Sequence, residues 1–181
     1  EGITRITAQD ILYANEMHMA VKLLASSRKV NDQFYAMVAP FLMDDSHPLY
    51  SVNGVFNAIF VHGNVLGDAM FYGSGAGKLP TASAVVADVV DAVKHLNRTV
   101  MTFWSSRKLS LSSIENAERR FFLRIPVVKL SEAQALFPGS EVVRVAELPE
   151  ECALVSDQMS EKAFEEKAQK LGGVISRIRL V

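Results

Sequence analysis

The sequence has 181 residues, of which 49% are hydrophobic and 22% are charged, and its formal net charge is −1. This composition is typical of a folded globular protein and argues against a disordered chain. The charge balance does not favour nucleic acid or an anionic membrane as a partner, and no apolar run approaches the roughly 20 residues of a membrane span. The single cysteine, Cys152, excludes an internal disulfide and is typical of a reducing compartment, so we expect a cytoplasmic protein.

The first part of the chain predicts one helix followed by strands. Thr7, with Asp10 three residues later, is typical of a helix N-cap and an acidic first turn. An apolar stripe at helical spacing then predicts a helix over about residues 8–28. The members of that stripe are Tyr13, Met17, Ala20, Val21 and Leu24. Runs of β-branched and aromatic residues predict three strands, over residues 34–42, 52–61 and 65–72.

A second helix is predicted over residues 80–96, because apolar and charged residues there lie on opposite faces at helical spacing. The apolar face consists of Ala82, Val85, Val86, Val89, Val93 and Leu96. The following residues, 97–116, are rich in serine and aperiodic, which predicts a connector. We expect Phe103 and Trp104 in this connector to dock on a flanking domain.

The last part of the chain predicts the element order βαββαβ, which is the ferredoxin-like split unit. Strands are expected over residues 121–128, 141–147, 153–158 and 174–180. A short helix is expected over residues 131–137, and a longer one begins after Ser160 and ends at Gly172-Gly173. Arg119, Arg120 and Arg124 are candidate nucleotide or acid ligands, although a strand with solvated faces explains them better.

A loop with glycines at alternate positions precedes the second helix, in the stretch MFYGSGAGKLPTASAVVADVVD. Its glycines, Gly73, Gly75 and Gly77, permit positive φ angles and close approach of a ligand, and Pro80 suits the first turn of a helix. A helix start offers unpaired N–H groups that suit phosphate or carboxylate. The spacing is neither G-x-x-x-x-G-K-[ST] nor G-x-G-x-x-G, so a tight turn without a ligand fits the pattern equally well.

Three stretches in the same order resemble homoserine dehydrogenases. They are residues 1–25, which contain ITAQDILYANEM and VKLLA, residues 47–61, HPLYSVNGVFNAIFV, and the glycine loop with its helix. The resemblance implies an α+β fold, with a mixed-sheet substrate and dimerisation domain over residues 1–100 and a connector over 101–116. Over residues 117–181 the chain is similar, by order of elements, to a smaller ACT-like regulatory domain. The family's N-terminal dinucleotide-binding region is not in this sequence, so we expect a fragment.

The resemblance also implies the roles of individual residues. The loop is expected to contact NADP or NAD held by the dinucleotide-binding domain, with Gly77 and Gly75 as cofactor-binding residues. Thr81 either caps the helix or reaches the cofactor. No catalytic residue is expected in this chain, because the resemblance places the catalytic lysine upstream of residue 1, and Lys22 is expected to be a solvated helix lysine. No pair of histidines has metal-ligand spacing, so no metal site is predicted.

The activity implied is the NAD(P)-dependent interconversion of L-homoserine and L-aspartate 4-semialdehyde, in the biosynthesis of threonine, methionine and isoleucine. We expect the fragment itself to be inactive and to form a homo-oligomer, as a dimer, with its valine stripe covered by another chain or the helix displaced. One alternative is a non-catalytic module that senses an amino acid such as threonine. The turn at Val128–Glu132 lacks the Pro-Gly usual in ACT domains, which argues against an effector there. A purely structural oligomerisation piece is the other alternative.

Overall fold

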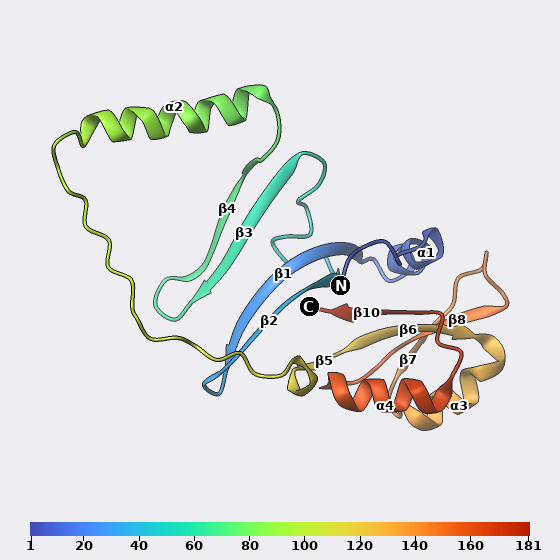
Figure 1. Cartoon of the computed structure of the whole chain (residues 1–181). Helices are drawn as coiled ribbons and strands as arrows, with labels where there is room; N and C mark the ends of the chain where they lie inside the picture. Colours follow the sequence, from blue (N-terminus) through green and yellow to red (C-terminus); the bar gives the residue numbers. More distant parts are fainter. The chain divides into compact units, whose positions relative to one another are not determined.

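A computed structural model describes residues 1–181 in full. The chain forms two compact units, one made of Glu1–Asp45 together with Leu109–Val181 and the other of Ser46–Lys108 (Figure 1). The fold is α+β and contains a mixed sheet, which confirms the predicted class. None of its helices has both the length and the apolar character needed to cross a bilayer.

The first unit is built on a six-stranded sheet in the order β1-β2-β10-β6-β8-β7. Its strands are β1 (Ala20–Val30), β2 (Gln33–Met43), β6 (Phe121–Pro126), β7 (Glu141–Val143), β8 (Glu151–Val155) and β10 (Ser176–Leu180). Neighbouring strands are antiparallel, except that β2 and β10 pair in parallel. Two further short strands, β5 (Glu118–Arg119) and β9 (Met159–Ser160), pair with each other.

The predicted βαββαβ order is confirmed in the C-terminal part. It consists of β6, α3 (Leu130–Leu136), β7, β8, α4 (Glu161–Leu171) and β10, with 3-10 turns at Ile114–Asn116 and Val127–Lys129. The Ser160 hydroxyl accepts a hydrogen bond from the Ala163 N–H at 3.1 Å, as expected for the cap of α4. Three of the strands end earlier than predicted: β6 ends at Pro126, β7 at Val143 and β8 at Val155.

The C-terminal strands of the six-stranded sheet are covered on both faces. The alternation along β6 sends Phe121, Leu123 and Ile125 to the face packed by α3 and α4, while Phe122 packs on the other face with Tyr13 of α1 (Ala8–Glu16). The rings of Tyr13 and Phe122 lie 5.8 Å apart. Residues from the start of the chain therefore share one hydrophobic core with residues from its end.

The predicted helix over residues 8–28 is correct only as far as Glu16 and wrong beyond it. His18 takes a left-handed conformation, with φ of 55°, and the Met19 N–H donates to the Ala14 carbonyl oxygen at 2.8 Å. This bond closes the helix end, and the chain continues as β1, which pairs along its whole length with β2. Lys22 thus lies on a strand, where burial lowers the pKa of its ammonium group.

The second unit contains the hairpin of β3 (Phe56–Gly63) and β4 (Gly67–Ser74), followed by α2 (Lys78–Lys94). These elements confirm the two predicted strands and the predicted second helix, although β3 begins four residues later than expected. Helix α2 buries none of its side chains. Phe103 and Trp104 in the connector are 84% and 93% exposed, so their predicted docking is wrong for this structure.

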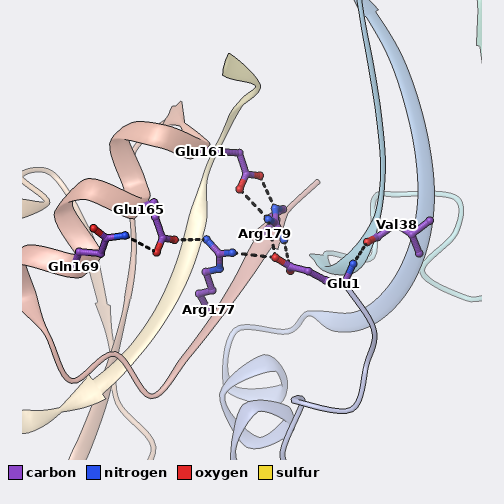
Figure 2. Close-up of polar contacts among 7 residues, drawn as sticks. All are labelled: Glu1, Val38, Glu161, Glu165, Gln169, Arg177 and Arg179. Atoms are coloured by element: carbon purple, nitrogen blue, oxygen red, sulfur yellow. Dashed lines mark hydrogen bonds and ion pairs between the residues drawn. The ribbon is translucent and has the colours of Figure 1, made fainter. Parts of the chain in front are cut away.

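A network of charged side chains joins Glu1 to β10 and α4 in the first unit (Figure 2). The buried Arg179 guanidinium donates to Glu161, with Nη2 to Oε2 at 2.8 Å, and to Glu1, with Nη1 to Oε2 at 2.7 Å. Arg177 bonds to Glu1 and to Glu165, at 2.9 Å in both cases. The hydrogen bond from Arg179 lowers the pKa of the Glu1 carboxyl from its ordinary 4.5 to about 2.

This depressed pKa predicts an acid-sensitive contribution to stability. The Glu1 carboxylate stabilises the fold fully above about pH 4.5, and the contribution is lost as the pH falls towards 2, because protonation breaks its bonds to Arg179. In urea titrations, the free energy of unfolding should therefore fall more steeply over this pH range for the unmodified chain than for Glu1→Gln. Parallel curves for the two proteins would contradict the assignment.

Candidate functional site

The glycine loop joins β4 to α2 with an unusual backbone at its last residue. Gly77 is the N-cap of α2 and has φ of 117° and ψ of 157°, a region that is essentially restricted to glycine. The Gly75 N–H donates to the Val55 carbonyl oxygen at 3.3 Å, and the Ser74 hydroxyl donates to the Ala76 carbonyl oxygen at 3.1 Å. Gly77 is thus required by the backbone of the loop itself.

Gly75 and Gly73 differ in what surrounds them. A Cβ atom at Gly75 would overlap the Asn57 side-chain amide nitrogen from β3, so that glycine makes room for Asn57. A Cβ atom at Gly73 would meet nothing within 4 Å, and its φ is not positive. The local structure therefore requires glycine at Gly77, places Gly75 against the Asn57 side chain, and gives no reason for Gly73.

The start of α2 lacks a side-chain cap. Thr81 is the fourth residue of the helix, and its N–H donates to the Gly77 carbonyl oxygen at 3.2 Å, so the predicted capping role of Thr81 is wrong. The first N–H groups of a helix have no partner within it, which leaves those of Lys78 and Leu79 available. Pro80, in the first turn as predicted, has no N–H to satisfy. No acidic side chain lies in this turn, so the positive end of the helix dipole is not offset.

The helix that follows presents a continuous apolar stripe to solvent. Its members are Val85, Val86, Val89 and Val93, together with Leu96 just past the helix end, and they are 57%, 59%, 57%, 59% and 65% exposed. The neighbouring hairpin exposes Ile59 and Phe71, each at 67%. Adjacent exposed apolar residues on this scale are typical of a surface that packs against another protein domain.

The other candidate residues lie away from this loop. Arg120, between β5 and β6, is solvated, as predicted, and donates to the Ser156 carbonyl oxygen at 3.2 Å. Arg124 is instead buried among Asp10 and Glu151, with Nε 3.6 Å and 3.4 Å from their carboxylate oxygens, so a solvated face is wrong for it. Arg119 is also buried. The pattern of apolar residues in the sequence did not predict the burial of either arginine.

Comparison with known proteins matches this chain to one family. The sequence model of the family described as Homoserine dehydrogenase matches residues 1–90. The homoserine dehydrogenase of Neisseria gonorrhoeae is 44% identical over 94 residues, covering 52% of this chain and 22% of that protein. The homoserine dehydrogenase of Pseudomonas aeruginosa is 37% identical over 133 residues, covering 69% of this chain and 31% of that protein.

Solved structures extend the match over the whole chain. A homoserine dehydrogenase from Thiobacillus denitrificans superposes with a TM-score of 0.81 and 28% identity, covering 100% of this chain and 47% of that one. A homoserine dehydrogenase from S. aureus superposes with a TM-score of 0.73 and 29% identity, covering 100% of this chain and 46% of that one. The chain thus spans about half the length of these solved relatives and less than a third of the curated ones. From the sequence match over its first half and the structural match over its full length, the chain belongs to the homoserine dehydrogenase family.

Proposed function

We propose that this chain is the part of an NAD(P)-dependent homoserine dehydrogenase that forms one wall of the nicotinamide nucleotide site, the other wall being a dinucleotide-binding domain. The main support is the positive φ of Gly77 at the uncapped start of α2, within the stretch that matches the family. The reaction is the interconversion of L-homoserine and L-aspartate 4-semialdehyde. The chain alone is expected to be inactive, because the resemblance places the catalytic lysine upstream of residue 1.

The residues of the loop fit a nucleotide by their chemistry. The absence of a side chain at Gly77 lets a ligand approach the backbone, and the N–H groups of Lys78 and Leu79 can donate to negatively charged oxygens. Gly75 contributes by leaving the Asn57 amide in place beside the loop. NADP or NAD, when bound, supplies the hydride chemistry, and the dinucleotide-binding domain sets the preference between the two. Thr81, which does not cap the helix, is free to contact the cofactor through its hydroxyl.

The exposed stripe of α2 supports a partner domain for this wall. Burying one large apolar side chain contributes on the order of 1.5–3 kcal/mol, so the five exposed side chains of the stripe, Val85, Val86, Val89, Val93 and Leu96, favour a covered state. We propose that the dinucleotide-binding domain covers them in a cytoplasmic enzyme.

We further propose a homodimer formed through the sheet. Strand β1 is at one edge of the six-stranded sheet and is paired on one side only, which leaves an edge available to a second copy. The boundaries that we propose for the family's parts are residues 1–100 for the substrate and dimerisation region and 117–181 for an ACT-like regulatory part. Support for the latter is the strand order β10-β6-β8-β7, which is that of the ferredoxin-like unit.

The proposed activity can be tested by placing the chain behind the dinucleotide-binding domain of a homoserine dehydrogenase. We expect the joined protein to reduce NADP or NAD in the presence of L-homoserine, and the chain alone to show no such activity. A joined protein that folds, binds the nucleotide and shows no homoserine-dependent reduction would contradict the proposal. Calorimetry of the chain with threonine addresses regulation separately, since saturable heat would favour an effector site.

A further inference from the structure

A cavity of about 370 Å³ lies in the first unit, beside the tip of the β1–β2 hairpin. Its lining includes Arg28, Tyr35, Asn116, Glu118, Arg119 and Gln158. A volume of this size is within the range of cavities that hold small ligands. Neither the glycine loop nor the stripe of α2 contributes to it, so the cavity is separate from the proposed nucleotide site.

Arg119 is the buried cation of this cavity. It is 7% exposed, and its guanidinium lies 5.0 Å from the centre of the Phe41 ring, but no carboxylate is within ion-pair distance and its Nε has no hydrogen-bond partner. A buried guanidinium without an anion is costly, since its charge has lost water without gaining a partner. The other buried arginines, Arg124 and Arg179, both have carboxylates. Arg119 is the exception among them.

A second unpaired guanidinium lines the same cavity. Arg28, near the end of β1, is exposed and forms no ion pair either. Burial, and then the charge of Arg28, lower the pKa of the Arg119 guanidinium, while the Glu161 carboxylate opposes the shift. The Glu118 carboxylate is held by the Gln158 side-chain amide at 3.1 Å rather than by either arginine. Two cations and one anion leave the cavity with a net positive charge.

The lining is held by secondary structure on both sides. Arg119 pairs with Met159 in the β5–β9 ladder. Opposite, the hairpin turns at Asn31 and Asp32, with φ of 48° and 62°, and the Tyr35 hydroxyl donates to the Gln33 side chain. Two successive residues with positive φ form the tight turn that matches the twist of paired strands. Arg119 is thus positioned before any ligand arrives, at the side of the cavity opposite the hairpin.

We infer that this cavity is a binding site for a small molecule with a carboxylate group. The carboxylate accepts hydrogen bonds from the guanidinium groups of both Arg119 and Arg28. A planar carboxylate can accept paired hydrogen bonds from a guanidinium. A dianionic phosphate would lose more hydration than a monoanionic carboxylate on entering the partly buried cavity, which favours the carboxylate. The amides of Asn116 and Gln158 provide polar partners for the rest of the ligand.

The test uses the 181-residue chain in low-chloride buffer with three probes: acetate, L-lactate and inorganic phosphate. NMR titration follows the arginine Nε–H signals and the backbone amides around the cavity. We expect saturable binding of acetate and lactate with dissociation constants on the order of millimolar, which is typical of ligands with so few atoms, and weaker binding of phosphate. Binding should depend on the two cavity arginines and not on net charge alone.

Matched variants separate these effects. Arg28→Gln should weaken lactate binding by about tenfold or more, because it removes a charge-assisted hydrogen bond, whereas Arg5→Gln removes the same charge from an exposed arginine elsewhere and should leave binding unchanged. Arg119→Lys keeps the charge but loses the planar fork, and should also weaken binding. No saturable shifts around the cavity, tighter binding of phosphate, or equal effects of Arg28→Gln and Arg5→Gln would each overturn the inference. None of these readouts depends on dehydrogenase activity, so the inference and the proposed function can fail separately.

Discussion

Replacing Arg179 with methionine is expected to lower the free energy of unfolding by about 3–5 kcal/mol, because it leaves the Glu161 carboxylate buried without its partner. Arg179 and Glu161 are 4% and 6% exposed, and the guanidinium donates to both oxygens of Glu161. Burial opposes the charge of Arg179, but the hydrogen bonds to Glu161 and Glu1 prevail and raise its pKa. Urea denaturation followed by circular dichroism measures the loss.

The neighbouring arginine of the network provides the matched control. Arg177 pairs with Glu1 and Glu165, but its side chain is 32% exposed, so Arg177→Met should cost no more than about 1 kcal/mol. The double variant Arg179→Met with Glu161→Leu should recover much of the lost stability, since it removes both buried charges. Equal costs for Arg177→Met and Arg179→Met would show that burial of the pair does not determine its effect.

Truncating Phe164 to alanine is expected to lower the free energy of unfolding by about 3–5 kcal/mol, because it opens a cavity at the centre of the C-terminal core. Phe164 on α4 is 0% exposed, and its ring stacks on Phe121 with centroids 4.1 Å apart and packs against Phe137 at 5.6 Å. The substitution thus removes the ring that contacts both Phe121 and Phe137. The same denaturation experiment measures the cost.

An exposed phenylalanine in the connector makes the control for this truncation. Phe103 is 84% exposed, so Phe103→Ala removes the same atoms from a solvated position and should change stability by less than about 0.5 kcal/mol. If Phe164→Ala were as mild as Phe103→Ala, α4 could not be packed on the sheet as described.

The incorrect helix over residues 8–28 shows where sequence periodicity misleads. Residues 8–28 contain apolar positions at helical spacing, but after His18 these positions belong to a strand, and the pairing of β1 with β2 outweighs the local pattern. The sequence held one signal for the hairpin, Asn31-Asp32 between two extended runs, which are residues that tolerate positive φ.

The βαββαβ part could be predicted because each of its elements carries local signals, such as the Ser160 cap and the Gly172-Gly173 end of α4. The wider sheet could not. The parallel pairing of β2 with β10 and the packing of Tyr13 on Phe122 join residues far apart in sequence, and no local pattern encodes such contacts.

The glycine loop was found from its residues, whereas the cavity around Arg119 was not. Gly77 lies between a strand and an amphipathic helix, so the sequence alone indicated a special backbone there. Arg119 lies in a two-residue strand, which is too short for an alternation of exposed and buried residues to be recognised in the sequence. Its burial and its lack of a carboxylate emerge only from the tertiary structure.

A kinetic comparison of two glycine variants tests whether the Gly77 backbone forms part of the nucleotide site. In the protein joined to a dinucleotide-binding domain, Gly77→Ala adds a methyl group at a φ of 117° and should raise KM for NADP or NAD by about tenfold or more, while KM for homoserine changes less. Gly73→Ala, where the added Cβ meets nothing within 4 Å, should leave both constants near those of the parent. A Gly77→Ala protein that folds as the parent does and keeps its KM for the nucleotide would show that Gly77 is not part of the nucleotide site.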